Sequence, residues 1–467
     1  MMEIIASLRR ELDGFGENLV LIGADALRER HPGEHPDNFG AGVMAQPATP
    51  EAAAAVVRWC ATHGVPVVPQ GGRTGLVGGG VSRPGELILS TGRLTRIEAI
   101  DPLARTAVVE AGVTLQALQE AAAAFGLVPG IDLAARGSAT IGGMIATNAG
   151  GILAFRNGVM RHQVLGLEAV MPDGSLYSDL TQVVKVSAGP DIKQLLIGSE
   201  GAFGFVTRAV LKLDRFNPMR ATALVGLPDA AAALSIIGHF RSNTSVELEG
   251  AELMWWPFLR DSATERGFAL DWLEAGTPAV LLLEISAASE AEARETLEDG
   301  LATLWNDLRL SGATLAASLD QSRRFWALRE ESDFIYRFAP AAPSFDISVP
   351  PGLLDTYVAA LLGRLKAADP AFDAYVYGHA ADGNLHLSVT GPGSAEPERR
   401  DAIEDAVYGG IAELGGSFSA EHGVGQEKRR AYLTYGNAAR RAAAGAVKAA
   451  LDPQDLFNRG KAPYRGA

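Results

Sequence analysis

The chain has 467 residues, of which 47% are hydrophobic, with 55 acidic and 41 basic residues and a formal net charge of −14. This length and hydrophobic content predict two to four domains with a large core, and they exclude a mainly disordered protein. The negative balance argues against a nucleic-acid partner, and the single cysteine, Cys60, excludes intrachain disulfides and cysteine-ligated iron–sulfur clusters.

No stretch of the sequence approaches the ~20 apolar residues of a membrane span. Residues 1–12 predict a short amphipathic helix and lack the basic start and apolar run of a signal peptide. Because the lone cysteine also suits a reducing compartment, we expect a cytoplasmic protein without a membrane span.

The first half of the chain predicts short strands, helices and three glycine-rich loops. Thr114 is a suitable N-cap for one of the helices. The predicted elements, in chain order, are a helix over Pro50–His63 ended by Gly64, a strand at 65–69, a loop at 70–80, strands at 87–90, 97–100 and 106–111, a helix at 114–125, a loop at 136–151, a hairpin of 164–171 and 176–178, a loop at 198–205 and a strand at 206–213.

The pattern changes near Asn217. Strands at 221–227 and 279–285 then alternate with more highly charged helices at 230–241 and 290–305. This alternation predicts a second, α+β domain with an antiparallel sheet. A last helix is expected to begin at Asn437.

The glycine excess points to a nucleotide-type ligand. Glycines number 53, well above the ~7% average, and they concentrate in the three loops. Glycine lets backbone N–H groups approach a phosphate closely, although any single loop of this kind is more often a tight turn. Neither the G-x-G-x-x-G nor the G-x-x-x-x-G-K-[ST] pattern occurs, so an NAD site or a P-loop receives little support.

The segment 377–386 offers two possible metal ligands. Its Asp382-Gly383 pair predicts a two-residue hairpin turn, which would make His379 and His386 direct cross-strand partners about 4.5–5.5 Å apart at Cα. Two histidines in one window are usually unrelated residues. Here Glu421 supplies a third ligand, and two histidines with one carboxylate leave open positions for a catalytic metal.

Several motifs in register carry a family resemblance. They are Pro69–Gly75, Gly137–Gly143 with Asn148–Gly151, Gly198–Gly201, the Asn458–Lys461 tail, Gly378–His386 and Ala420–Gly425. The first four resemble the FAD-linked oxidases of the vanillyl-alcohol oxidase (PCMH) type. The last two resemble, within that group, the FAD-dependent D-2-hydroxyacid dehydrogenases, which include the D-2-hydroxyglutarate and D-lactate dehydrogenases.

The resemblance implies an α+β fold with a two-subdomain PCMH-type FAD-binding domain and a cap domain with an antiparallel sheet. Residues 1–218 would form the FAD-binding domain, 219–436 the substrate- and metal-binding cap, and 437–467 a segment returning to the FAD domain. Members with covalent flavin carry a histidine in the first glycine loop. Arg73 and Thr74 stand there in this chain, so we expect non-covalent FAD.

The resemblance also implies which residues contact FAD. The first loop would hold the pyrophosphate, the second and third would line the flavin, and the tail would reach the ring. The implied residues are Pro69, Gly71, Gly72, Arg73, Thr74, Gly75, Leu76, Gly137, Ser138, Thr140, Ile141, Gly143, Asn148, Gly150, Gly151, Glu200, Gly201, Gly204, Val206 and Asn458.

The same family implies a mechanism. His379, His386 and Glu421 would hold Zn²⁺ or Mn²⁺. A 2-hydroxy acid would chelate this ion through a carboxylate oxygen and its hydroxyl, and its α-hydride would pass to flavin N5. Neighbouring side chains of an extended segment point to opposite sides, so His422 would face the substrate as general base, unless it is a structural histidine. Arg329 matches a position that binds the substrate carboxylate, although it could equally be a helix-surface arginine.

One departure concerns the substrate. Hydroxyglutarate-specific relatives usually place a lysine two residues before the Asp346–Pro350 stretch, and Ser344 stands there in this chain. A serine cannot neutralise a distal carboxylate, which puts 2-hydroxyglutarate in doubt and leaves room for lactate or a larger apolar hydroxy acid. The preference for the D-enantiomer comes from the resemblance alone.

Two other functions fit the same residues. The histidines and Glu421 would also suit a metal-dependent hydrolase with purely structural glycine loops, and the chain could be the flavoprotein subunit of a larger oxidoreductase complex. Since no haem-attachment motif is visible, electrons must leave to an external acceptor, for which the resemblance implies an electron-transfer flavoprotein or a quinone. A homodimer is one option for the assembly.

Overall fold

The computed structural model describes residues 2–461 and Tyr464. The chain forms two compact units: unit 1 comprises the chain up to Phe216 and again from Glu421, and unit 2 is Asn217–Ala420. Both combine helices with sheets, and the expected α+β architecture with an antiparallel sheet in the second domain is confirmed. Each unit is described by itself below.

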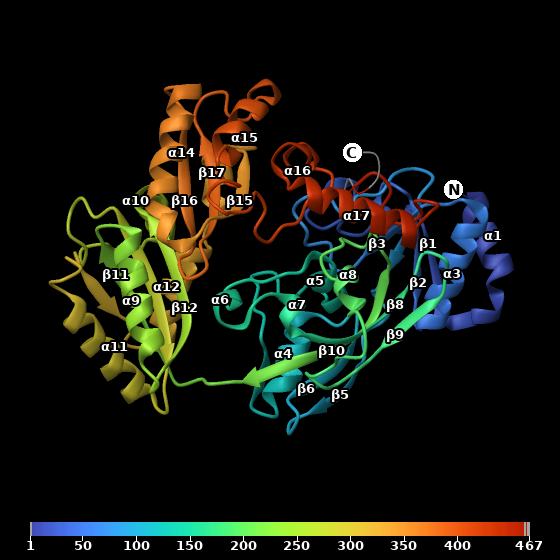
Figure 1. Cartoon of the computed structure of the whole chain (residues 1–467), viewed down its shortest axis with the longest axis horizontal. Helices are drawn as coiled ribbons and strands as arrows, with labels where there is room; N and C mark the ends of the chain where they lie inside the picture. The colour runs from blue at the N-terminus through green and yellow to red at the C-terminus, as the bar shows by residue number, and fades with distance from the viewer. Residues whose placement is uncertain (1, 462–463, 465–467) are drawn as a thin grey trace. The chain divides into compact units, whose positions relative to one another are not determined.

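Unit 1 contains a small mixed sheet in the order β1-β2-β4-β3, in which β2, β4 and β3 run parallel (Figure 1). Helix α3 (Pro50–His63) packs on it through Val56 and Val57. The bounds of α3 and its end at Gly64 were predicted; the Thr49 hydroxyl caps the helix, and Gly64 has the left-handed conformation. The strands are β1 (Leu19–Gly23), β2 (Val43–Pro47), β3 (Val67–Gln70) and β4 (Leu87–Ser90).

A second, antiparallel sheet of unit 1 has the order β5-β6-β10-β8-β9, with β7 also pairing with β10. Helices α4 (Leu115–Ala123) and α5 (Ile141–Thr147) contribute to its core, and the predicted hairpin around Pro172 joins β8 to β9. The strands are β5 (Ile97–Asp101), β6 (Thr106–Glu110), β7 (Leu127–Pro129), β8 (Val164–Val170), β9 (Leu176–Asp179) and β10 (Phe205–Arg215).

The return of the chain to unit 1 begins at Glu421, earlier than the expected Asn437. Backbone N–H groups explain this: those of Val424 and Gly425 donate to the Glu200 carboxylate, and that of Gln426 to the Val77 carbonyl. The other helices of unit 1 are α1 (Met2–Glu11), α2 (Ala24–Arg28), α6 (Ala154–Asn157), α7 (Met160–Gln163), α8 (Lys193–Leu196), α16 (Arg429–Tyr435) and α17 (Ala438–Leu451).

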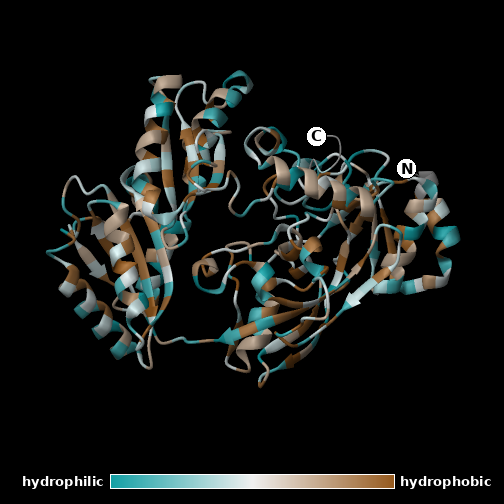
Figure 2. Cartoon of the chain, viewed as in Figure 1, coloured by the Kyte–Doolittle hydropathy of each residue, from teal (hydrophilic) through white to brown (hydrophobic). Residues whose placement is uncertain are grey.

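Unit 2 is built on a seven-stranded sheet in the order β14-β11-β13-β12-β16-β17-β15, with every neighbouring pair antiparallel. In Figure 2 its strands show brown segments between white and teal ones, because buried apolar residues are interspersed with polar residues along them. The strands are β11 (Arg220–Leu227), β12 (Glu247–Trp255), β13 (Ala279–Ser286), β14 (Ala313–Leu315), β15 (Ser344–Ser348), β16 (Asp373–His379) and β17 (Asn384–Thr390).

One face of this sheet carries the polar residues discussed below. Phe258, Phe325 and Phe334, from three helices, form an apolar core with Met254 and Leu282 on that face. The helices on this face are α10 (Trp256–Arg266), α12 (Leu319–Glu330) and α13 (Asp333–Phe338), and the remaining helices of unit 2 are α9 (Ala230–Ser242), α11 (Glu290–Leu304), α14 (Leu354–Ala368) and α15 (Arg400–Tyr408). Within the described part of the chain, no helix has the length and apolar character required to cross a bilayer.

Candidate active site

Unit 1 contains a cavity of 360 Å³ at its three glycine loops, which is in the range of small-molecule sites. Its wall is mainly backbone and short side chains. It comprises Pro69–Val77, Gly79, Gly80, Thr91, Leu133–Ala135, Ala139, Thr140, Gly142–Met144, Ala146, Thr147, Ala149, Gly150, Leu196, Ser199–Gly201, Gly204–Val206, Glu421 and His422.

The first two loops approach each other so closely that side chains are excluded. A Cβ atom at Gly72 would lie 1.9 Å from the Ser138 carbonyl oxygen, and one at Gly71 would lie 2.3 Å from Thr140 Oγ1. The glycines are therefore required by packing at these two positions, in addition to exposing backbone N–H groups to the cavity.

The polar atoms of the cavity wall fit a large ligand with both donors and acceptors. Gln70 Oε1, Thr91 Oγ1 and Arg73 Nε are buried without a hydrogen-bond partner among the described residues. Buried polar groups are normally paired, so these atoms indicate a ligand that satisfies them. The heteroatoms and phosphates of FAD provide such partners, and the residues present therefore fit this cofactor.

Most of the residues expected to contact FAD lie on this wall: Pro69, Gly71, Gly72, Arg73, Thr74, Gly75, Leu76, Thr140, Gly143, Gly150, Glu200, Gly201, Gly204 and Val206. Six do not, namely Gly137, Ser138, Ile141, Asn148, Gly151 and Asn458. The amides among these six have structural contacts: Asn148 accepts from the Arg161 N–H, and Asn458 Nδ2 donates to the Gly79 and Glu200 carbonyls. Asn458 Oδ1 is buried without a hydrogen-bond partner among the described residues. Sequence reasoning missed Thr91 and Leu133–Ala135, which lie outside the glycine loops.

The segment that returns to unit 1 contributes Glu421 and His422 to the cavity wall. Glu421 Oε1 accepts a hydrogen bond of 2.6 Å from the Gly151 N–H of the second loop. The opposite orientation of the Glu421 and His422 side chains was predicted for an extended segment. In the structure residues 420–422 form bends instead. The next part of the segment is held by Glu200, whose pKa is raised by burial of its carboxylate.

In unit 2 the predicted direct pairing of His379 with His386 is wrong. The register pairs Tyr377 with His386 and His379 with Asn384, so the loop contains four residues, 380–383. Gly383 explains the longer loop: its carbonyl accepts from the Val349 N–H, and a Cβ there would lie 1.9 Å from the Val349 carbonyl oxygen.

The two histidines nevertheless share a face. The observed register differs from the predicted one by two residues, and a shift of two keeps both side chains on the same face because side chains alternate along a strand. His379 and His386 are then diagonal neighbours, which remain within reach of each other. The ring centroids of His379 and His386 are 5.4 Å apart, and ligand nitrogens of the two rings lie within 4.8 Å of each other. Two imidazoles at this separation have the donor chemistry of a transition-metal site.

A carboxylate that the sequence did not suggest orients His379. Glu252 of β12 is the direct cross-strand partner of His379, and its Oε1 lies 2.7 Å from His379 Nδ1. Glu252 Oε2 accepts from Arg329 Nε at 2.8 Å. Burial raises the pKa of Glu252, but His379 and Arg329 together outweigh it and hold this pKa below its ordinary value. The sequence could not single it out, because β12 also carries Glu247 and Glu249.

Arg329 is 9% exposed, so the alternative of a helix-surface arginine is wrong. Besides its bond to Glu252, its guanidinium carbon lies 4.8 Å from the ring centroid of Tyr377, in cation–π contact. Helix α12 thus directs a cation onto the face that carries His379 and His386.

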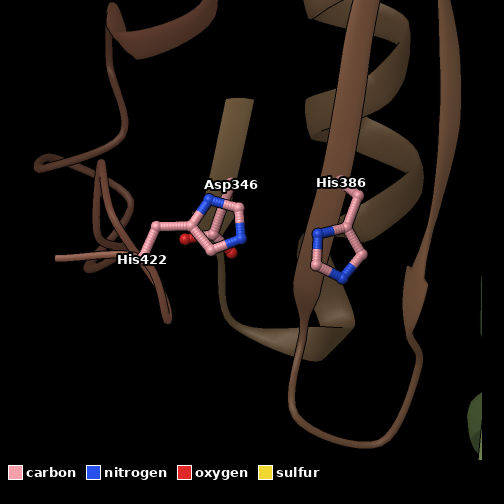
Figure 3. Close-up of side chains that lie close together, drawn as sticks. All are labelled: Asp346, His386 and His422. Carbon is pink, nitrogen blue, oxygen red and sulfur yellow. The ribbon is translucent and has the colours of Figure 1, made fainter. Parts of the chain in front are cut away.

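Asp346 of β15 is a second carboxylate on this face. It pairs in register with His386, and Figure 3 shows the two side chains on neighbouring strands. Its Oδ1 accepts from Asn384 Nδ2 at 2.9 Å, and its Oδ2 accepts from the Ala420 N–H at 3.0 Å. Ala420, the last residue of unit 2, is therefore hydrogen-bonded to this face, and Glu421 and His422 follow it directly in the chain. Figure 3 also draws His422.

Known proteins resemble the chain along most of its length. A family model described as FAD binding domain matches residues 41–179, and one described as FAD linked oxidases, C-terminal domain, matches residues 217–462. A D-2-hydroxyglutarate dehydrogenase of Xanthomonas citri pv. viticola is 36% identical over 90% of this chain and 88% of its own. One of Stutzerimonas stutzeri is 34% identical over 89% of each chain.

Among solved structures, alkyldihydroxyacetonephosphate synthase superposes with a TM-score of 0.64 at 17% identity, covering 90% of this chain and 77% of its own. At this identity the likeness concerns the fold alone. It agrees with the expected PCMH-type architecture.

Proposed function

The chain belongs to the FAD-linked oxidases, and on that basis we propose that it oxidises a D-2-hydroxy acid to the 2-oxo acid, with FAD and a divalent cation, Zn²⁺ or Mn²⁺. The names of the bacterial relatives support this substrate class. The observation that carries the proposal is the pair of histidines on one face of unit 2, one of them oriented by Glu252.

His379, His386 and Glu421 are the residues we propose as ligands of the cation. The cation would supply Lewis acidity toward the substrate hydroxyl, and bound FAD would supply a hydride acceptor at flavin N5. Three protein ligands leave room for a chelating hydroxy acid. Support for Glu421 comes from connectivity, because its neighbour Ala420 is hydrogen-bonded to Asp346, the partner of His386.

Glu252 has a positioning role in this proposal. When His379 donates its Nδ1–H to the Glu252 carboxylate, the lone pair remains on Nε2, the nitrogen available to a cation. The ionised state of Glu252, favoured by Arg329, keeps this tautomer in place.

Arg329 would orient the substrate carboxylate. Its Nε is occupied by Glu252, so a substrate would meet the edge formed by the two terminal nitrogens, which can donate two parallel hydrogen bonds. The same contact fixes the guanidinium before the substrate arrives, which reduces the ordering cost of binding.

His422 is the residue we propose as general base for the hydroxyl proton. It lies on the wall of the glycine-lined cavity, and its neighbour Glu421 is anchored to Gly151. The C2 hydrogen leaves as a hydride and the hydroxyl hydrogen leaves as a proton to the imidazole, which gives the 2-oxo acid.

The two alternative functions, a metal-dependent hydrolase and a subunit of a larger complex, are not equally supported. The metal-dependent hydrolase required purely structural glycine loops and loses its basis with membership of the FAD-linked oxidases. A flavoprotein subunit of a larger complex stays open, as do an electron-transfer flavoprotein or a quinone as acceptor and a homodimer as assembly. We also propose non-covalent FAD, because Arg73 and Thr74 offer no histidine for a covalent bond.

Anaerobic flavin reduction by the purified chain tests the proposal. A panel of D- and L-2-hydroxy acids, including D-2-hydroxyglutarate and D-lactate, is mixed with the FAD-loaded protein before and after treatment with a chelator. We expect bleaching of the flavin by D-acids, its loss with the chelator and its recovery with Zn²⁺ or Mn²⁺. Bleaching that is indifferent to chelation would remove the metal from the proposal.

A further inference from the structure

We infer that a cluster of three hydroxyl groups, those of Tyr336, Ser344 and Ser388, binds the far end of the substrate and selects a D-2-hydroxy acid with an uncharged, hydrogen-bonding tail. This inference rests on the proposed function and specifies its substrate class. The cluster lies entirely in unit 2.

The cluster occupies the same face as the proposed metal ligands. Ser344 and Ser388 are cross-strand partners, and the next same-face pair along these strands is Asp346 with His386. Two residues of a strand span about 7 Å, close to the length of a five-carbon acid. An acid held at His386 by its carboxylate and hydroxyl therefore reaches the serine pair with its other end.

The three hydroxyls form one chain of hydrogen bonds that opens to solvent. Tyr336 Oη lies 2.6 Å from Ser344 Oγ, which lies 3.1 Å from Ser388 Oγ. Ser388 is 3% exposed, Tyr336 is 45% exposed and Ser344 is exposed. Each hydroxyl has one donor and two acceptor positions. Ser344 Oγ also donates to the Ala342 carbonyl at 3.5 Å, so Tyr336 and Ser388 donate to Ser344 and keep spare acceptor positions for a ligand hydroxyl or amide N–H.

The charges around the cluster disfavour a second carboxylate. Strands β15, β16 and β17 carry neither lysine nor arginine. On α10 and α13, Arg260 pairs with Asp261, Arg337 with Glu265 and Glu331, and Arg266 also with Glu331. On α12, Arg329 pairs with Glu252, Arg324 lies over the Phe268 ring and Arg323 is exposed.

Tyr375, the register partner of Ser388 on the other side, donates its hydroxyl to Asp261. A carboxylate that reaches the buried Ser388 would lose hydration there and would meet no lysine or arginine on these strands. An amide or a hydroxyl would find partners there, and a site built to hydrogen-bond a group discriminates strongly against substrates that cannot satisfy it.

The first test compares acids of equal length in anaerobic flavin reduction: D-2-hydroxyglutarate, D-2-hydroxyglutaramate and D-2,5-dihydroxypentanoate. We expect the two neutral-ended acids to have kcat/KM values at least about tenfold above that of D-2-hydroxyglutarate. A preference for D-2-hydroxyglutarate would overturn this inference and leave the proposed function intact. Reduction by none of the acids, nor by D-lactate, would overturn both.

The second test moves the preference with one substitution. Ser344→Lys places a cation at an exposed position of the cluster and should raise kcat/KM for D-2-hydroxyglutarate about tenfold or more, while that for the neutral acids falls. Ser242→Lys, at the exposed end of α9, adds the same charge elsewhere in unit 2 and should change neither.

Calorimetric binding of 2-oxoglutarate and 2-oxoglutaramate to the oxidised, FAD-loaded variants gives a readout independent of turnover. We expect 2-oxoglutaramate to bind the unmodified chain more tightly, and Ser344→Lys to reverse that order. An unchanged order of both affinity and kcat/KM in a folded Ser344→Lys protein would show that the cluster does not meet the substrate tail.

Discussion

The cavity of unit 1 and the polar face of unit 2 are built by opposite means. The cavity wall is mostly backbone, and at Gly71 and Gly72 it depends on the absence of side chains. The polar face consists of side chains on neighbouring strands, and each depends on a partner brought by another strand or helix, as His379 does on Glu252. A backbone wall is therefore sensitive to added atoms, and a side-chain face to removed ones.

The largest effect is expected from adding one methyl group to the backbone wall. Gly72→Ala places a Cβ 1.9 Å from the Ser138 carbonyl oxygen, which neither loop can avoid without moving. We expect the purified variant to contain almost no flavin, measured by absorbance after denaturation. Gly238→Ala is the matched control, because its Cβ meets nothing within 4 Å on an exposed turn of α9.

Loss of flavin in Gly72→Ala alone would show that the cavity of unit 1 depends on its backbone wall. If Gly72→Ala retains a full complement of FAD, the close approach of the first two loops does not shape the cofactor site. The control should retain normal flavin content and gain up to about 1 kcal/mol of stability, since alanine is the better helix former.

The sequence could predict the features of fold and site that depend on local signals, and it could not predict those that depend on contacts between distant segments. The helix Pro50–His63, with its Thr49 cap and terminal Gly64, was predictable because its signals are local. The face of His386 was also predictable, because alternation along a strand is local. The register was not, because Gly383 lengthens the loop through a contact with Val349, which is distant in sequence. Glu252 and Asp346 became candidates only once β12 and β15 were placed beside the histidine hairpin.

A second prediction removes the proposed base. His422→Asn keeps a polar side chain of similar size on the cavity wall but cannot take up a proton at neutral pH. We expect the rate of flavin reduction by a D-2-hydroxy acid to fall about 10²–10⁴-fold with FAD and metal content unchanged. Stopped-flow absorbance measures the rate. A decrease below tenfold would reduce His422 to a structural role.

A third prediction concerns the partner of His379. Glu252→Gln retains the shape of the side chain, but the amide is a weaker acceptor for His379 Nδ1–H and leaves Arg329 without its counter-charge. We expect metal affinity to fall about 10–100-fold, measured by competition with a chromogenic chelator.

The matched control is Glu249→Gln on the same strand, where the carboxylate is also buried but binds Ser286 and Arg220. Its metal affinity should be unchanged. An equal loss in both variants would mean that the damage is to β12 in general rather than to the orientation of His379.

The smallest effect is expected from a side-chain pair of unit 1 that supports a sheet rather than the cavity. Glu168 of β8 accepts two hydrogen bonds from its cross-strand neighbour Arg208. Burial raises the pKa of Glu168, but the Arg208 and Thr207 contacts outweigh it and leave this pKa below its ordinary value. Stability from the pair is then fully present above about pH 4.3, the ordinary pKa, and is lost as the pH falls through the folded-state value.

Glu168→Gln should therefore lower the free energy of unfolding by about 1–3 kcal/mol at pH 7, and by less in acid, with flavin content unchanged. Urea denaturation at pH 7 and at about pH 3.5 measures the difference. Glu98→Gln is the control, because Glu98 meets the same arginine at 3.5 Å in a more exposed pair, which is worth about 0–1 kcal/mol. A loss of flavin in Glu168→Gln would contradict the division drawn above, because a side-chain pair outside the cavity wall would then be shaping the backbone wall.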